Sequence, residues 1–304
     1  MSRTEANLGF ATLTNPIMPA SGCFGWGREY SKLFDLKVLG AVVTKAVTPE
    51  PRLGNPGIRI AETPAGMLNS IGLQNSGLEG AINEDLPWLL AQGVPILINV
   101  AGRTQEDYVR VAEALADYDL LGLELNLSCP NVQEGGITFG TDANIVYNLV
   151  KAVKDVCPLP LVVKLSPNVT DISAPALAAQ EGGARALTLI NTLRGMTIDI
   201  QTRRPLLGNI TGGLSGPAIK PVALAFVWQV ARAVDLPIIG CGGIAHVEDV
   251  IEFLLAGAAA VQVGSATFAD PLLLPRLVAE LDQWLEREGT SVKNIVGAAH
   301  GRGK

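Results

Sequence analysis

At 304 residues the chain exceeds the usual size of one domain, but parallel α/β barrels reach this length, so we expect a single domain over residues 1–304. Its 48% hydrophobic and 17% charged residues argue against disorder, and a net charge of −6 without a long basic run argues against a nucleic-acid partner. No secretory signal and no apolar run of membrane-spanning length is present, so we expect a soluble cytoplasmic protein without a membrane partner.

Eight apolar runs with the character of β-strands recur along the chain. They cover residues 17–21, 41–47, 95–101, 122–128, 161–166, 186–191, 237–242 and 260–265. Amphipathic stretches predict helices between them at residues 105–118, 144–156, 172–181, 221–234 and 247–256, and Thr104, Asp142 and Asp171 are candidate N-caps. Strands that alternate with helices indicate parallel crossovers, and eight of them predict an α/β fold of the (β/α)8 TIM-barrel class.

Three further segments do not fit the barrel repeat. Residues 5–15 predict an N-terminal hairpin beneath the barrel. After the second and sixth strands, residues 48–77 and 192–216 are too long for simple loops, and we expect hairpins at 58–66 and 196–202 within them. Both insertions follow the carboxyl ends of strands, where barrel active sites are built.

The stretch at residues 121–131 draws the most attention. Glu124 and Asn126 interrupt an apolar strand at alternating positions, so both point to one face and need buried partners or a ligand. Pro130 ends the strand and places Cys129 in a loop at its carboxyl end. A lone cysteine is often only a small buried hydrophobe. The glycines in the following loop, residues 132–141, favour a lid over a site at Cys129.

The other cysteines point to no metal centre. Cys23, Cys129, Cys157 and Cys241 are far apart in the sequence and form no Cys-x-x-Cys pair, and the chain has only two histidines. We therefore expect no zinc or iron–sulfur site in this chain. Free thiols fit a reducing cytoplasm.

Polar or small residues end nearly every predicted strand, and we expect them to line one pocket at the barrel mouth. They are Ser21, Lys45, Asn99, Asn126 with Cys129, Lys164, Asn191, Gly242 with Gly243, and Gly264 with Ser265. Two lysines at one rim favour anion binding or the tuning of a cofactor over a purely structural role. Glycine pairs after strands seven and eight favour a phosphate site, so the pocket suits a flavin mononucleotide (FMN).

Seven motifs give the chain a resemblance to the dihydroorotate dehydrogenases. They are PASG at 19–22, TKA at 44–46, NSIGLQN at 69–75, NLSCPN at 126–131, VKLSPN at 163–168, GGLSGP at 212–217 and GCGGI at 240–244. Cys129 resembles class 1 of the family, because class 2 has serine there. The run GGITFGTD at 135–142 is similar to the catalytic subunit of the NAD-dependent subclass 1B.

The resemblance implies oxidation of (S)-dihydroorotate to orotate in pyrimidine biosynthesis. Cys129 would take the C5 proton as a thiolate, FMN would take the hydride, and Lys164 would stabilise negative charge on the reduced ring. It implies cofactor contacts from Ser21, Lys45, Ala46, Asn99, Asn126, Lys164, Ile190, Gly216, Gly242, Gly243, Gly264 and Ser265. It implies substrate contacts from Lys45, Asn69, Ser70, Ile71, Gly72, Leu73, Asn126, Asn191 and Thr192.

The resemblance also implies a partner, since the chain has no nicotinamide-binding glycine signature of its own. Subclass 1B pairs a homodimer of catalytic chains with an electron-transfer subunit that carries FAD and a 2Fe–2S cluster. We therefore expect a heterotetramer that passes electrons to NAD.

Several alternatives remain open at this point. The chain could be class 1A-like and use another acceptor, such as fumarate. It could be a flavin barrel like that of dihydropyrimidine dehydrogenase, although that family usually has histidine where this chain has Asn131. A Schiff-base aldolase that uses Lys164 without flavin would be colourless, and a scaffold without catalysis would not require Cys129 and the lysines to converge.

Overall fold

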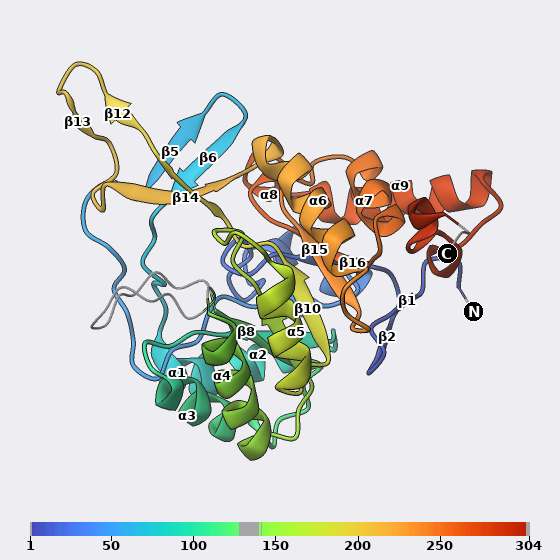
Figure 1. Cartoon of the computed structure of the whole chain (residues 1–304), viewed down its shortest axis with the longest axis horizontal. Coiled ribbons are helices and arrows are strands. Elements are labelled where there is room, and N and C mark those ends of the chain that lie inside the picture. The colour runs from blue at the N-terminus through green and yellow to red at the C-terminus, as the bar shows by residue number, and fades with distance from the viewer. Residues whose placement is uncertain (1, 128–139, 141, 302–304) are drawn as a thin grey trace.

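The structure is a computed structural model, and it describes residues 2–127, 140 and 142–301 (Figure 1). Cys129 and most of the proposed lid therefore lie outside the described residues. Within the described ranges, no helix is both long and apolar enough to cross a membrane.

The described residues form an eight-stranded parallel sheet that curls into a nearly closed barrel. Its strands are β3 (Ile17–Pro19), β4 (Val42–Val43), β7 (Ile96–Val100), β8 (Gly122–Asn126), β9 (Leu161–Lys164), β10 (Ala186–Leu189), β15 (Ile238–Cys241) and β16 (Ala258–Val263). Their order is β3-β16-β15-β10-β9-β8-β7-β4, and the Gly40 N–H donates to Ile17 O (3.0 Å) where the two ends meet. All eight predicted strands are confirmed, and with them the TIM-barrel class.

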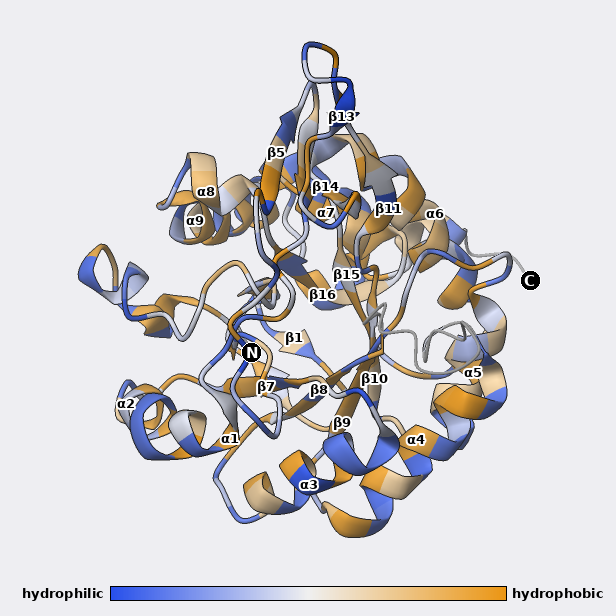
Figure 2. Ribbon diagram, turned by 90° about the vertical axis from the view of Figure 1, so that its left-hand side faces the viewer, coloured by the Kyte–Doolittle hydropathy of each residue, from blue (hydrophilic) through white to orange (hydrophobic). Residues whose placement is uncertain are grey.

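Helices surround the strands (Figure 2). They are α1 (Gly77–Gly80), α2 (Leu86–Leu90), α3 (Gln105–Leu115), α4 (Ala143–Val156), α5 (Ser173–Glu181), α6 (Lys220–Val230), α7 (Val247–Leu255), α8 (Ala266–Ala269), α9 (Leu273–Arg287) and α10 (Val292–Ile295). The five predicted helices are present, and Thr104 and Asp142 cap α3 and α4 as expected. The expected cap of α5 was wrong by one position, because Ile172 is the N-cap. The Asp171 carboxylate still accepts the Ser173 N–H (2.9 Å).

The core lies inside the barrel and between the strands and the helices. Every residue of β7, β8, β9, β10, β15 and β16 is buried, as expected for strands covered on both faces. On α9, Leu274, Leu277, Leu281 and Leu285 are fully buried at helical spacing. Each such side chain contributes about 1.5–3 kcal/mol through its removal from water.

The N-terminal hairpin lies under the barrel, as predicted. It consists of β1 (Ala6–Asn7) and β2 (Thr12–Leu13), which pair antiparallel. Its turn residue Gly9 lies against Pro237, the residue that precedes β15, and Leu8 and Leu13 are buried. The hairpin therefore covers the amino-terminal end of the strands, opposite the site.

The two insertions join in one antiparallel sheet of order β11-β14-β6-β5, which the sequence did not predict. The first insertion gives β5 (Ile60–Thr63) and β6 (Gly66–Asn69), close to the expected hairpin. The second gives β11 (Leu193–Met196), β12 (Ile198–Asp199), β13 (Arg204–Pro205) and β14 (Thr211–Ser215). The hairpin-like segment expected at 196–202 is present with shifted bounds: β12 and β13 pair as a hairpin over 198–205, while β11 pairs with β14. This sheet extends beyond the strand ends of the barrel (Figure 1).

Candidate functional site

The register of the barrel brings the polar strand ends together. Asn126, the last residue of β8, is paired in register with Lys164, the last residue of β9. Lys164 is in turn paired with Thr188 on β10. The barrel thus gathers at its carboxyl end side chains that are far apart in the sequence.

Lys164 is the centre of a buried polar network. Its side chain is 4% exposed, and its Nζ donates to Ser21 Oγ (3.2 Å) and to Gln262 Oε1 (3.1 Å). Glu124, which is fully buried, has Oε1 3.9 Å from the same nitrogen. Among the described residues these are the two hydrogen bonds of the ammonium, which has three N–H donors. One N–H therefore remains for a further acceptor.

Glu124 accepts hydrogen bonds from three side chains of this network. Its Oε1 accepts Asn99 Nδ2 (2.7 Å), and its Oε2 accepts Thr188 Oγ1 (2.8 Å) and Gln262 Nε2. These donors stand on β7, β10 and β16, so the carboxylate lies in the barrel interior. A buried carboxylate needs such compensation, because an unpaired one is costly to desolvate.

Charge keeps the Lys164 ammonium protonated. Burial alone would lower its pKa, but the ionised forms of Cys241, Glu124 and Cys23 would attract the ammonium and together raise the pKa above its ordinary value. Burial also raises the pKa of both thiols, that of Cys23 to about 12, so the thiols are neutral near pH 7. Glu124 is then the anion that balances Lys164.

Lys45 stands in a different environment. It follows β4 and is half-buried, and its backbone N–H donates to Gly25 O (2.8 Å). Burial, and then the positive charge of Arg59, lower the pKa of Lys45 below its ordinary value. The two predicted lysines therefore differ: Lys164 is locked in the network, whereas Lys45 carries no partner carboxylate among the described salt bridges.

The amide side chains at β8 and β10 meet as predicted. Asn191 Nδ2 donates to Asn126 Oδ1 (3.1 Å), and the Thr192 N–H donates to Asn191 Oδ1 (2.7 Å). Tyr108 Oη donates to Asn126 O (2.7 Å) and anchors the end of β8 from α3. These contacts fix the amides before any ligand arrives.

Asn69 is the last residue of β6 in the antiparallel sheet of the two insertions, and residues 70–73 follow it. Asn69 Nδ2 donates to Gly213 O (3.3 Å) on β14. Asn55 Nδ2 donates to Ser70 Oγ (3.0 Å), and the Asn55 N–H donates to Ile71 O (2.9 Å). The next two residues, Gly72 and Leu73, both have positive φ, at 78° and 53°. A side chain at Gly72 would collide with Asn55, so glycine is required there.

Small residues approach one another at the ends of β14, β15 and β16. We call the predicted set Gly216, Gly242, Gly243, Gly264 and Ser265 the glycine cradle. Cys241 on β15 is paired with Gln262 on β16, so the residues that follow both strands emerge side by side. A Cβ at Gly243, where φ is 76°, would lie 2.8 Å from Gly216 O. A Cβ at Gly264 would lie 3.4 Å from Cys23 Sγ. Neighbouring protein atoms therefore leave little room for a side chain at Gly243 and pack closely around Gly264.

The residues present fit the pyrimidine edge of a flavin. Within the described part of the chain, Asn99 Oδ1 is buried and has no hydrogen-bond partner, while its Nδ2 is bound to Glu124. Lys164 offers a free donor on the same network. The pyrimidine edge of a flavin presents acceptors at N1 and O2 and a donor at N3. The free N–H of Lys164 suits the acceptors, and Asn99 Oδ1 suits the donor.

Of the remaining predicted residues, some are described by the structure and others lie outside the described residues. Ala46 is buried beside Lys45, and Ile190 is buried after β10, where the Leu189–Ile190 peptide bond is cis. Cys129 and residues 132–139 lie outside the described residues, so the base and the lid stay predictions. Gly140 is described and packs against the Leu127 backbone.

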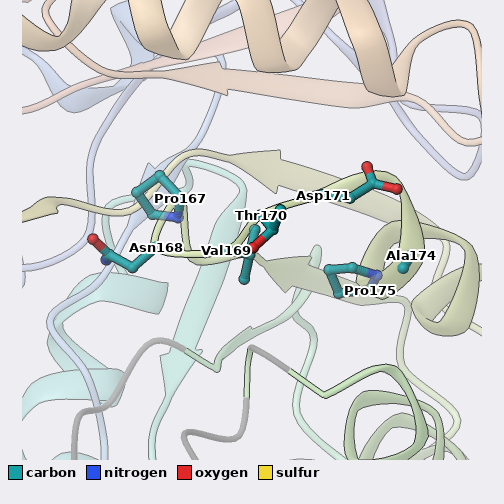
Figure 3. Close-up of a pocket in the computed structure, with 7 residues that line it drawn as sticks. All are labelled: Pro167, Asn168, Val169, Thr170, Asp171, Ala174 and Pro175. Carbon is teal, nitrogen blue, oxygen red and sulfur yellow. The ribbon is translucent and has the colours of Figure 1, made fainter.

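A hollow of about 460 Å³ lies in the loop between β9 and α5 (Figure 3). It is lined by Pro167, Asn168, Val169, Thr170, Asp171, Ala174 and Pro175. Asn168 and Asp171 lie at opposite ends of this loop (Figure 3). The Asn168 side chain donates to Thr192 O (3.1 Å) and accepts the Arg194 N–H (2.9 Å). The loop thus supports Thr192, and the network around Lys164 lies outside this hollow.

Sequence reasoning singled out Glu124 and two of its partners, Asn99 and Lys164, but missed Thr188 and Gln262. Thr188 and Gln262 are polar residues in apolar strands, and that pattern could have identified them. Cys23 and Cys241, which influence Lys164, carried no such signal.

Comparison with known proteins gives one consistent result. The family model described as "Dihydroorotate dehydrogenase" matches residues 4–285. A Geobacillus kaustophilus protein named "Dihydroorotate dehydrogenase B (NAD(+)), catalytic subunit" is 56% identical over 290 residues, which cover 95% of this chain and 93% of the relative. A Listeria monocytogenes protein of the same name is 54% identical over 292 residues, 96% of each chain.

Proposed function

The chain belongs to the dihydroorotate dehydrogenase family, and we propose that it oxidises (S)-dihydroorotate to orotate in pyrimidine biosynthesis as an FMN-dependent catalytic subunit. The observation that carries the proposal is the buried Lys164 ammonium with one free N–H, on the same network as the unpartnered Asn99 Oδ1. Oxidation of a carbon–carbon single bond needs a hydride acceptor, and this donor–acceptor pair suits a flavin edge.

The cofactor would lie across the barrel mouth. Lys164 and Asn99 would hold the ring edge, with Ser21, Lys45, Ala46, Asn126 and Ile190 around it. The glycine cradle would hold the phosphate through backbone N–H groups, which glycine leaves uncovered. When bound, FMN supplies the acceptor for the hydride from C6 of the substrate.

The substrate would lie between the second sheet and the ends of β8 and β10. Lys45 would bind its carboxylate. Asn69, Asn126, Asn191 and Thr192, with residues 70–73, would hold the ring amides. Because Asn126 and Asn191 already bond to each other, they are preorganised for a planar ring with alternating donors and acceptors.

Cys129 would remove the proton from C5. An ordinary thiol has a pKa of about 8.5, so its thiolate fraction, and with it the rate, should rise with pH through the neutral range. A closed loop over residues 132–141 would exclude water from this step.

The Schiff-base alternative is disfavoured by the same network. A lysine that forms an imine must be a neutral amine, whereas Lys164 has a raised pKa and a buried carboxylate 3.9 Å away. Lys164 is therefore suited to an electrostatic role.

The relatives are named as NAD(+) enzymes and as catalytic subunits, which supports a further part of the proposal. We expect a homodimer of this chain to join an electron-transfer subunit with FAD and a 2Fe–2S cluster in a cytoplasmic heterotetramer. On its own, the chain should reduce artificial acceptors with dihydroorotate but barely reduce NAD.

Acceptor and substrate profiles of the purified chain test the proposal. A yellow protein that releases FMN on denaturation and oxidises dihydroorotate with a dye acceptor is the expected result. Turnover of dihydrouracil instead would favour the dihydropyrimidine dehydrogenase-like alternative, and efficient turnover with fumarate would favour class 1A.

A further inference from the structure

Glu124 has no role in binding the substrate or the cofactor in the function proposed above. It is nevertheless the residue that accepts most of the hydrogen bonds in the buried network around Lys164. Both carboxylate oxygens are used: Oε1 accepts from Asn99 (2.7 Å), and Oε2 accepts from Thr188 (2.8 Å) and from Gln262. The residue is fully buried. A neutral barrel core would not need a carboxylate here, because burying one is costly unless it serves a charged neighbour.

Gln262 lies between the Glu124 carboxylate and Lys164, and its carboxamide has one orientation. Its Nε2 donates to Glu124, so its Oε1 is turned to Lys164 Nζ at 3.1 Å. A carboxamide fixed in this orientation presents an acceptor, and an acceptor favours an ammonium over an amine with a lone pair. Glu124 therefore determines which end of Gln262 meets the lysine.

We propose that Glu124, acting directly and through Gln262, is a positioning residue that keeps Lys164 protonated and holds its ammonium beside Ser21 at the cofactor site. The effect of Glu124 on the reaction rests on the function proposed above. Its effect on the protonation of Lys164 does not depend on that function. The groups that face Lys164 are Glu124 on β8, Gln262 on β16, Cys241 on β15, and Ser21 and Cys23 after β3. Of these, Glu124 is the carboxylate, and burial raises the pKa of both thiols.

A direct titration of Lys164 tests the proposal. The full-length protein is labelled with ¹³C at the lysine ε-carbon, and the Lys164 signal is assigned by its loss in Lys164→Arg. In the unaltered chain the pKa of Lys164 lies above the ordinary lysine value. In Glu124→Gln the attraction between the carboxylate and the ammonium is lost, so the pKa of Lys164 should be lower than in the unaltered chain. The fold should tolerate this variant, because glutamine has the shape of glutamate and its amide oxygen can still accept from Thr188 and Gln262.

Thr188→Val is the matched control. It removes one hydrogen bond to Glu124 Oε2 but leaves the charge in place, so the raised pKa of Lys164 should persist. If Glu124→Gln left the pKa of Lys164 unchanged, or if both variants lowered it equally, the positioning role would be refuted. An equal effect of both variants would mean that the pKa of Lys164 depends on the packing of the network and not on the charge of Glu124.

A second measurement, the pH dependence of the FMN midpoint potential, tests whether Lys164 lies at the cofactor site. In the unaltered protein Lys164 keeps its proton throughout, so it contributes nothing to the pH dependence of the FMN midpoint potential. In Glu124→Gln, reduction should take up an additional proton, up to one per two electrons, at pH values between the pKa of Lys164 beside oxidised FMN and its higher pKa beside reduced FMN. If the unaltered chain binds no FMN while Glu124→Gln shifts the Lys164 titration, the positioning role is upheld and the proposed function is contradicted. A shifted titration with bound FMN but unchanged proton uptake would refute the placement of the ammonium at the cofactor site.

Discussion

Removing the charge of Lys164 should leave Glu124 buried without its counter-charge. The two groups are 3.9 Å apart, with side chains 5% and 0% exposed. At an effective dielectric constant near 20 this separation corresponds to an attraction of about 4 kcal/mol. Loss of one partner of a buried pair typically costs about 3–5 kcal/mol. We therefore expect Lys164→Met to lower the free energy of unfolding by roughly that amount.

A double-mutant cycle with Glu124→Gln measures how much of the loss is electrostatic. Lys164→Met/Glu124→Gln removes both charges, so it should be more stable than Lys164→Met alone, with a coupling energy of about 2–3 kcal/mol. The assay is equilibrium unfolding in urea at pH 7, followed by circular dichroism. One series is measured without FMN and one at saturating FMN, because a bound ligand adds stability of its own.

The control for this cycle is Lys151→Met. It breaks the Lys151–Asp155 ion pair on α4, whose side chains are 51% and 57% exposed. Solvent screens such a pair, so unfolding should not change measurably. Additive losses for Lys164→Met and Glu124→Gln would refute the reasoning, because independent residues show no coupling.

Three further predictions concern the proposed site. Cys129→Ser should lower turnover of dihydroorotate by about 10²–10⁴-fold, while absorbance shows FMN still bound; unchanged turnover at every pH would remove Cys129 as the base. Gly243→Ala forces a side chain into left-handed backbone with φ 76° and against Gly216 O, at a cost of about 1–2 kcal/mol; FMN content after dialysis should fall, and full occupancy would argue against the glycine cradle. Because the pKa of Lys45 is lowered, its positive charge is lost as pH rises through that lowered value, so KM for dihydroorotate should increase at alkaline pH. Arg59→Gln removes a cation that lowers this pKa, so the increase should move to higher pH; an unmoved profile would exclude Lys45 as the carboxylate ligand.

Local patterns were sufficient to predict the barrel, because each strand carries its own signal. The apolar run around Leu123 and Leu125 predicts a strand without any knowledge of its neighbours. The antiparallel sheet was missed for the opposite reason. It depends on pairing such as Leu68 with Leu214, residues from two insertions that no local pattern connects.

The same distinction applies to the site. Lys164 and Asn126 were predicted from their places at strand ends, and the register confirms that they lie side by side. The bond between Glu124 and Gln262 joins residues 138 positions apart and appears only when the barrel is formed. Cys129 was selected by its motif and by the family resemblance, and it remains a prediction.

Anaerobic mixing of the purified chain with (S)-dihydroorotate tests the central claim most directly. The account predicts that the flavin absorbance band bleaches and that one orotate forms per FMN within a single turnover, without NAD or any partner subunit. A colourless protein, or a flavin band that dihydroorotate leaves unchanged at every pH, would contradict it.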